Sequence, residues 1–233
     1  IIKHLGALKK FPILIFEKPF NLKGKSNDFK LVMNCEISQR KTQIALGVPK
    51  ETSRTQMTEI CLEREDRMIP PIVVEKNEAP VMEMVQTGKD VDMFELPIMR
   101  HHYMDGGPYI VMSTITKERQ GGTYNCSYHR MEVKSKNHTA LYSSPRHLWK
   151  IFRDYEDNKM ECPVATVLGH HPAYHMGACY SGPFQVSEYD IIGGYMQEAL
   201  RLTPSSTWGD NFLIPADAEV VIEGVLDPGK RVV

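Results

Sequence analysis

The second half of the chain is a series of short stretches in which apolar and polar residues alternate, separated by glycine, proline and other turn residues. Alternation with a period of two is typical of β-strands whose two faces meet different surroundings. Two stretches with helical spacing, 145–158 and 187–200, interrupt the series. The pattern predicts a β-barrel or a β-sandwich. The predicted strands are 109–118, 122–133, 138–144, 163–170 and 218–226.

The first part of the chain mixes helix and strand signals instead. A chain of 233 residues is long enough for one large domain or two small ones. The segment 67–85 contains three prolines between short apolar runs, which is typical of a connection or an edge strand. We therefore predict an N-terminal α/β domain over 1–85 and a second domain over 86–233. The elements expected in the first domain are strands at 11–16 and 28–35 and helices at 38–48 and 52–66.

Composition narrows the class of protein. Hydrophobic residues make up 42% of the chain and charged residues 24%, as in ordinary globular proteins. Its 28 basic and 29 acidic residues give a net charge of −1. This balance argues against a nucleic acid or an anionic membrane as partner. The sequence has no apolar run of the roughly 18 residues that a membrane span needs, and no signal peptide is visible in it.

The five cysteines are scattered and form no CxxC pair. A disulfide framework is therefore not expected, and a reducing, cytoplasmic location is favoured. Cys126 and Cys179 are expected to be neither nucleophiles nor disulfide partners. The chain begins at Ile1 and ends directly after an apparent strand, so we expect it to be part of a longer polypeptide.

The predicted strand 122–133 is unusually polar for a packed strand. It carries the carboxamide of Asn125 and the guanidinium of Arg130, so it either lies open to water or lines a polar pocket. Two further groups, His147 and Glu188, fall near the starts of the two predicted helices. A carboxylate, an imidazole and a carboxamide are acceptable ligands for Mg²⁺ or Mn²⁺. Each also has an ordinary explanation. Glu188 could be a partner of the helix dipole, His147 a helix cap or surface group, and Asn125 a bulge residue.

Histidines and glycines gather in three loops, "RHHYMDGGPY" at 100–109, "QGGT" at 120–123 and "GHHPAYH" at 169–175. Zinc-site spacings are absent, so we expect these histidines to make hydrogen bonds that shape turns. The glycines can let the backbone approach a cofactor closely, but neither pair matches a nucleotide-binding motif.

An ordered set of motifs resembles the UbiD-like decarboxylase family, whose members use prenylated flavin mononucleotide. The resemblance runs from about Phe11 to the last residue and is strongest from Leu96 onward. The motifs that carry it are "LPIMRHHYMDGGPYI", "YNCSYHRMEV", "SPRHLWKIF", "VLGHHPA", "VSEYDIIGG" and "IPADAEVVIEGVLDPGKR".

The resemblance implies an α+β fold: a split β-barrel related to flavin reductases, preceded by a small α/β domain. It implies prenylated FMN held through Mn²⁺ (or Mg²⁺), with K⁺ nearby. The implied metal ligands are Asn125, His147 and Glu188, and the implied catalytic residues are Arg130 and Glu223. The implied cofactor-binding residues are Asn125, Tyr128, His129, Arg130, Tyr142, Ser143, Ser144, Arg146, His147 and Glu188.

One geometric condition follows for the polar strand. Asn125 and Arg130 are five residues apart, so on a regular strand they point to opposite faces. For both to reach one flavin site, the strand would need a bulge or a strong twist between them.

The activity implied is reversible, non-oxidative decarboxylation of an aromatic or α,β-unsaturated carboxylic acid, acyl thioesters included. The implied partners are this small acid, further copies of the chain in a dimer or hexamer, and a flavin prenyltransferase that supplies the cofactor. The family's second acidic residue and its C-terminal dimerisation region would lie beyond Val233. Two alternatives stay open: a split-barrel FMN oxidoreductase, and a non-catalytic or assembly subunit of a multi-subunit carboxylase.

Overall fold

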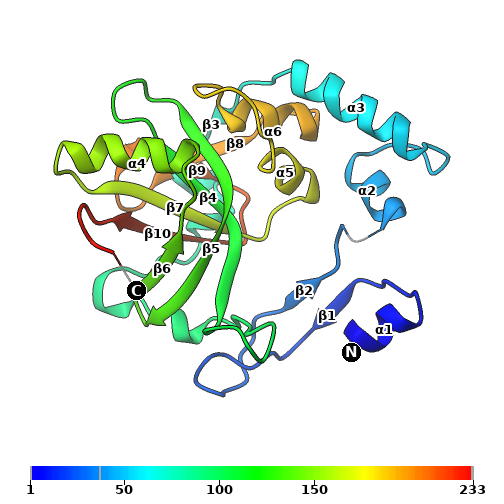
Figure 1. Cartoon of the computed structure of the whole chain (residues 1–233), viewed down its shortest axis with the longest axis horizontal. Helices are drawn as coiled ribbons and strands as arrows, with labels where there is room; N and C mark the ends of the chain where they lie inside the picture. Colours follow the sequence, from blue (N-terminus) through cyan, green and yellow to red (C-terminus); the bar gives the residue numbers. More distant parts are fainter. Residues whose placement is uncertain (1, 37, 232–233) are drawn as a thin grey trace.

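A five-stranded antiparallel sheet forms the centre of the protein in a computed structural model, which describes residues 2–36 and 38–231. The sheet is strongly curled, so that it resembles half of a barrel (Figure 1). All five strands were predicted from the alternation of apolar and polar residues. In spatial order they are β10 (Val220–Leu226), β7 (Cys162–Leu168), β4 (Tyr109–Lys117), β5 (Tyr124–Ser135) and β6 (His138–Tyr142).

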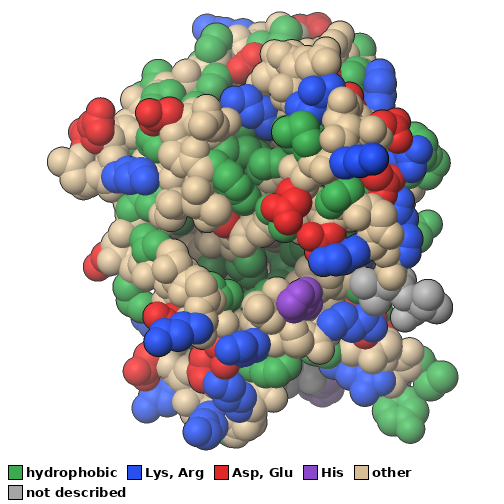
Figure 2. Space-filling view, turned by 90° about the vertical axis from the view of Figure 1, so that its left-hand side faces the viewer, with side chains coloured by type: hydrophobic (Ala, Val, Ile, Leu, Met, Phe, Trp, Pro, Cys, Tyr) green, Lys and Arg blue, Asp and Glu red, His purple; other side chains and the backbone are tan. Residues whose placement is uncertain are grey.

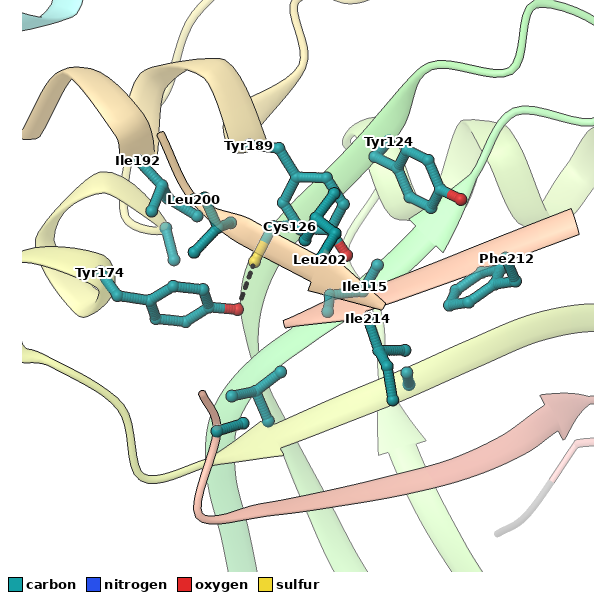
Figure 3. Close-up of a cluster of buried hydrophobic side chains, with 14 residues drawn as sticks. Ile115, Tyr124, Cys126, Tyr174, Tyr189, Ile192, Leu200, Leu202, Phe212 and Ile214 are labelled. Carbon is teal, nitrogen blue, oxygen red and sulfur yellow. Dashed lines mark hydrogen bonds between the residues drawn. The ribbon is translucent and has the colours of Figure 1, made fainter. Parts of the chain in front are cut away.

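One face of this sheet packs against helices α5 (Pro172–Gly177) and α6 (Glu188–Met196), and we refer to it as the α6 face. Ile115, Cys126 and Ala165 lie side by side across β4, β5 and β7 and are fully buried on this face. Tyr174 and Tyr189 from the two helices cover them (Figure 3). Burial of this cluster is the main packing contact of the domain.

A second, three-stranded sheet completes the cover of the α6 face. It consists of β3 (Ile72–Val73), β8 (Arg201–Ser205) and β9 (Gly209–Pro215). Its side chains Leu202, Phe212 and Ile214 join the same hydrophobic cluster. The sequence patterns did not predict β8, β9 or α5.

The opposite face packs partly against helix α4 (His147–Asp157), and we refer to it as the α4 face. Leu148, Ile151 and Tyr155 recur at helical spacing and are buried. Seen from the side on which α4 and β10 lie, the surface is hollowed, with hydrophobic side chains inside and charged ones around the rim (Figure 2).

The N-terminal part contains a β-hairpin and three helices. Helix α3 begins two residues after the predicted start at residue 52, and Ser53 caps it through a reciprocal capping box with Gln56. Short 3₁₀ turns at 76–78, 80–82, 88–90 and 93–95 lead into β4, and Asp92 caps the last of them. The remaining elements are α1 (Ile2–Ala7), β1 (Leu14–Phe16), β2 (Leu31–Met33), α2 (Gln39–Ala45) and α3 (Arg54–Asp66).

Helices α3 and α6 approach so closely that α6 needs glycine at the contact. A β-carbon on Gly194 would lie 2.3 Å from the carbonyl oxygen of Arg64. The Arg64 guanidinium donates to the carbonyl oxygens of Leu46 (2.7 Å) and Tyr195 (2.8 Å). The N-terminal part therefore holds α6, whose first residue is Glu188, in place against the sheet. The division at residues 85 and 86 stays a prediction, and β3, which precedes it, already belongs to the β8–β9 sheet.

We expect Gly194→Ala to lower the free energy of unfolding by about 2 kcal/mol, because the new methyl group must displace backbone. Gly6→Ala is the matched control, since Gly6 is also helical and nothing lies within 4 Å of its missing β-carbon. The control should gain roughly 0.5–1 kcal/mol from helix propensity. Urea unfolding of both variants measures the difference, and equal stabilities would contradict the proposed close contact.

No helix of the described residues is long and apolar enough to cross a membrane.

Candidate functional site

The polar end of β5 lies at a free strand edge. Strand β6 pairs with β5 only from Arg130 to Ser135, so residues 124–129 have a strand neighbour on one side alone, which is β4. The N-terminus of α6 occupies the vacant side. There the backbone N–H of Cys126 donates to Glu188 Oε2 at 3.0 Å, and Asn125 Nδ2 donates to Glu188 Oε1 at 3.1 Å. The N-terminus of α6 thus lies where a longer β6 would have paired with β5.

Glu188 is the most unusual charge of this cluster. Its side chain is 3% exposed, and the two N–H donors that it meets are neutral. Burial raises the pKa of Glu188 to about 7, although the hydrogen bonds from Cys126 and Asn125 oppose the shift. The nearest basic group is His147, whose Nδ1 lies 4.0 Å from Glu188 Oε1. A buried carboxylate in these surroundings lacks a countercharge.

His147 is the first residue of α4 and faces the same point. Burial, followed by the charges of Lys150 and Arg146, lowers the pKa of His147, so the imidazole is neutral near pH 7 and can act as a ligand. The Phe184 ring contacts it edge to face, with 5.3 Å between ring centroids. Asn125, His147 and the segment 184–186 line one small recess. No pattern in the sequence indicated that Phe184 belongs to this group.

A polar row continues from Asn125 along the α4 face of β5. Ser127 Oγ lies 3.2 Å from Asn125 Oδ1 and 2.9 Å from His129 Nε2. His129 Nδ1 lies 3.3 Å from the carbonyl oxygen of Tyr142, the last residue of β6. Ser127 was not among the predicted site residues, although its period-two spacing between Asn125 and His129 was a usable signal.

Arg130 lies on the α6 face, away from this row. Strand β5 is regular from Asn125 to Arg130, and its register shifts only between Val133 and Ser135. The strand therefore has no bulge between the two residues, whose side chains point to opposite faces, and only a strong twist of the strand could bring both to one flavin site. Arg130 is exposed, and no carboxylate among residues 2–36 and 38–231 pairs with it. Across the strands it lies between Val111 and Tyr142, which are 41% and 73% exposed.

Arg130 and Glu223, the two catalytic residues that the family resemblance implies, do not pair in this structure. Glu223 aligns with Ala165, Ile115 and Cys126 across the sheet, so two strands and four positions along β5 separate it from Arg130. Its carboxylate instead accepts from the backbone N–H groups of Ser206 (3.2 Å) and Thr207 (3.0 Å). The alternation in β10 fixed only the face on which Glu223 lies, not its neighbours.

The other predicted residues divide between the two faces. Tyr128 lies on the α6 face, where its hydroxyl hydrogen-bonds His175 Nδ1 at 2.7 Å. Ser143, Ser144 and Arg146 form the connection from β6 to α4, and Arg146 is the N-cap residue of α4. The structure therefore gathers Asn125, His129, His147 and Glu188 at one strand edge, next to the 142–146 connection.

The remaining predictions on histidines and cysteines concern the loops and the core. His171 Nδ1 accepts from the backbone N–H of Ala173 and caps α5, which confirms that histidines of this loop shape a turn. All five cysteines are free thiols. Burial raises the pKa of Cys126 to about 12, so this thiol stays protonated.

We expect Glu188 to make the metal- and flavin-free protein less stable as pH rises from about 4.5 to about 7, relative to a variant that lacks this carboxyl group. In this window the folded protein keeps a proton on Glu188 that the unfolded chain, with a pKa near 4.5, has released. The loss attributable to Glu188 should be roughly 3 kcal/mol above the window. Urea unfolding at pH 5 and pH 8 measures it, with Glu188→Gln as the control that should lack it. Identical pH dependences in the two proteins would contradict the buried carboxylate.

Comparison with known proteins decides the family. The model of the UbiD 3-octaprenyl-4-hydroxybenzoate carboxy-lyase Rift-related domain matches residues 72–233. The chain belongs to the UbiD family. Its UbiD relatives include a phenolic acid decarboxylase of Streptomyces sp. (strain D7), 31% identical over 94% of this chain and 46% of the relative. An anhydromevalonate phosphate decarboxylase of Methanosarcina mazei is 29% identical over 87% of this chain and 45% of the relative.

Solved UbiD-class structures share the fold. HmfF from Pelotomaculum thermopropionicum in complex with FMN has a TM-score of 0.79 and 29% identity, over 86% of this chain and 44% of HmfF. An evolved dimeric form of HmfF in complex with prFMN has a TM-score of 0.85 and 28% identity, over 98% of this chain and 51% of HmfF. The chain spans about half the length of the curated relatives that it matches.

Proposed function

We propose that the full-length protein is a carboxy-lyase that catalyses the reversible, non-oxidative decarboxylation of an aromatic or α,β-unsaturated carboxylic acid with prenylated FMN. Membership of the UbiD family supports the reaction class. The names of the relatives, two decarboxylases, and the flavins bound in the HmfF structures support the chemistry and the cofactor.

The observation that carries the proposal is the buried, uncompensated carboxylate of Glu188 beside Asn125 and His147. These residues fit a divalent cation, since oxygen ligands and a neutral imidazole suit Mn²⁺ or Mg²⁺. In the described part of the chain no three His, Cys, Asp or Glu side chains are grouped to hold a metal, so the Asn125 amide would have to contribute. The cation would balance Glu188 and the phosphate of the flavin.

The proposed roles of the protein groups follow from their surroundings. The exposed Arg130 guanidinium, flanked by Val111 and Tyr142, would bind the substrate carboxylate and orient it. Asn125, His147 and Glu188 would hold the cation, and the 142–146 connection would border the flavin. The prenylated flavin, when bound, supplies the electron sink for the carbanion left after loss of CO₂. We assign no proton-transfer role to Glu223 from its geometry, because its carboxylate already accepts from the Ser206–Thr207 turn.

Finer expectations extend this proposal. The curled sheet supports a split β-barrel related to flavin reductases. The dimeric HmfF form supports a homo-oligomer for the full-length protein. The five free thiols support a cytoplasmic location. The K⁺ site, the supply of cofactor by a flavin prenyltransferase and a C-terminal dimerisation region rest on the resemblance alone.

The test is to identify the flavin and the metal that remain bound to the purified full-length protein. Mass spectrometry of the released flavin and elemental analysis of the metal should give prenylated FMN and about one Mn²⁺ or Mg²⁺ for each flavin. Unmodified FMN that is reduced by a nicotinamide cofactor would favour the oxidoreductase alternative. A full-length protein that binds neither flavin nor divalent metal would favour the assembly-subunit alternative.

A further inference from the structure

The side-chain amide of Asn125 has two polar neighbours that both require a hydrogen-bond donor. The first is Glu188, whose carboxylate, in the ionised form that would bind a cation, can only accept. In the structure Asn125 turns Nδ2 toward Glu188 Oε1 at 3.1 Å, and its Oδ1 therefore faces Ser127 Oγ at 3.2 Å. This orientation gives Glu188 a donor, but it turns an acceptor, Oδ1, toward Ser127.

The second neighbour is a chain of hydrogen bonds whose direction is fixed from its far end. The carbonyl oxygen of Tyr142 can only accept, so the His129 Nδ1 atom facing it must carry the proton. Burial lowers the pKa of His129, and the neutral ring then has an acceptor at Nε2. That acceptor lies 2.9 Å from Ser127 Oγ and is the better partner for the single hydroxyl proton.

In the present orientation the polar groups around Ser127 therefore have one hydrogen-bond donor too few. Ser127 has one proton and faces two acceptors, His129 Nε2 and Asn125 Oδ1. If the proton goes to His129, Ser127 Oγ can only accept, and it needs Nδ2 of Asn125 and not Oδ1. Both neighbours thus compete for the one NH₂ group of Asn125. In either orientation the Asn125 Oδ1 atom, at a residue that is 5% exposed, then faces another acceptor.

We propose that Ser127 and His129 are positioning residues that turn the Asn125 amide oxygen toward Glu188 when a divalent cation binds there. A cation beside Glu188 removes the carboxylate's need for a donor. The amide can then rotate by half a turn, so that Nδ2 donates to Ser127 and Oδ1 faces the cation. Every group in the chain from Tyr142 to Asn125 then has the partner that it requires. This inference rests on the cation site of the proposed function, and it assigns new roles to two residues beside that site.

The alternating spacing of the row supports this role. Asn125, Ser127 and His129 occupy successive positions on the α4 face of a regular strand, and β4 holds that strand on one side. The end of β6 supplies the Tyr142 carbonyl that fixes the His129 tautomer. Such outer hydrogen bonds typically change metal affinity by about 10–100-fold when they are removed.

The experiment measures Mn²⁺ affinity of the full-length protein prepared without flavin, by titration calorimetry and by the electron paramagnetic resonance signal of free Mn²⁺. We expect Ser127→Ala and His129→Phe each to weaken binding by about 10-fold or more. Ser127→Thr keeps the hydroxyl and should stay within about threefold of the unmodified protein. A thermal melt of each variant establishes that it is folded.

The decisive comparison repeats Ser127→Ala in an Asn125→Asp background. An aspartate presents an oxygen in either orientation, so there is no amide to orient, and the loss caused by Ser127→Ala should disappear. An equal loss in both backgrounds, or no loss in either, would overturn the positioning role. His147→Ala separates the two proposals: if this change leaves Mn²⁺ affinity intact, the metal site itself is wrong. If it abolishes binding while Ser127→Ala does nothing, only the present inference fails.

Discussion

Arg130→Ala is expected to lower turnover of the flavin-loaded, full-length enzyme by about 10³-fold, the scale found when a preorganised charged or hydrogen-bonding partner of the reacting group is lost. Arg130 is exposed and has no acidic partner in the described part of the chain, so its charge is free for a substrate carboxylate. The fold and most of the bound flavin should survive, because Arg130 packs no core. CO₂ release, with bound flavin measured by absorbance, tests both statements.

Arg40→Ala is the matched control for the charge. Arg40 is also exposed, lies on α2 and makes no ion pair with any residue in the ranges 2–36 and 38–231. Its removal should leave turnover within about twofold, since surface charges of this kind contribute little. A comparable loss in both variants would show that net charge, and not substrate orientation, is responsible. Unchanged turnover in Arg130→Ala would remove this residue from the proposed mechanism.

Glu223→Gln, combined with Arg130→Ala, tests whether the two residues act together. The structure places Glu223 against the Ser206–Thr207 turn, two strands from Arg130. We therefore expect Glu223→Gln to cost less than tenfold in turnover and the two losses to be additive, as for independent sites. A double variant little worse than Arg130→Ala alone would indicate a shared site in the full-length protein and would restore the pairing implied by the family resemblance.

Glu188→Ala is expected to remove metal and flavin together, weakening Mn²⁺ binding by about 100-fold or more, since it deletes the sole carboxylate of the proposed ligand set. The flavin should follow the metal because the cation would bridge the protein and the phosphate. Metal and flavin content of the purified full-length variant give the answer directly.

Asp190→Asn is the control that separates a ligand from a helix-dipole partner. Asp190 is the other acidic residue in the first turn of α6, where a negative charge suits the helix dipole, but it makes none of the contacts of the polar cluster. We expect it to retain metal and flavin. Loss of both in the control as well would mean that the charge of the helix start, and not Glu188 itself, holds the cofactor.

The sequence predicted the central sheet well because its strands are short runs of mixed apolar and polar residues, rich in β-branched and aromatic side chains, that turn residues separate. It missed β8, in which Pro204 interrupts the pattern and sits at a register shift. It also missed α5, whose six residues are too few to show a helical period. These failures have a common cause: short elements that are stabilised by the cluster they cover carry little pattern of their own.

The candidate site was predictable only in part, for a different reason. Asn125 and Glu188 are 63 residues apart and meet because β6 ends early, which no local pattern records. The family resemblance supplied the ligand set, and the structure supports it by placing the three residues together. The resemblance did not supply Ser127, and it implied a pairing of Arg130 with Glu223 that this structure does not show.

The early end of β6 also bears on how this protein avoids aggregation. An uncovered strand edge is a template on which another chain can pair, and natural proteins commonly cover or charge such edges. Here the carboxylate of Glu188, at the start of α6, accepts a hydrogen bond from the edge N–H of Cys126. The same residue therefore covers the strand edge and belongs to the candidate metal site. Any change that loosens α6 from the sheet exposes that edge, and self-association would then accompany the loss of cofactor.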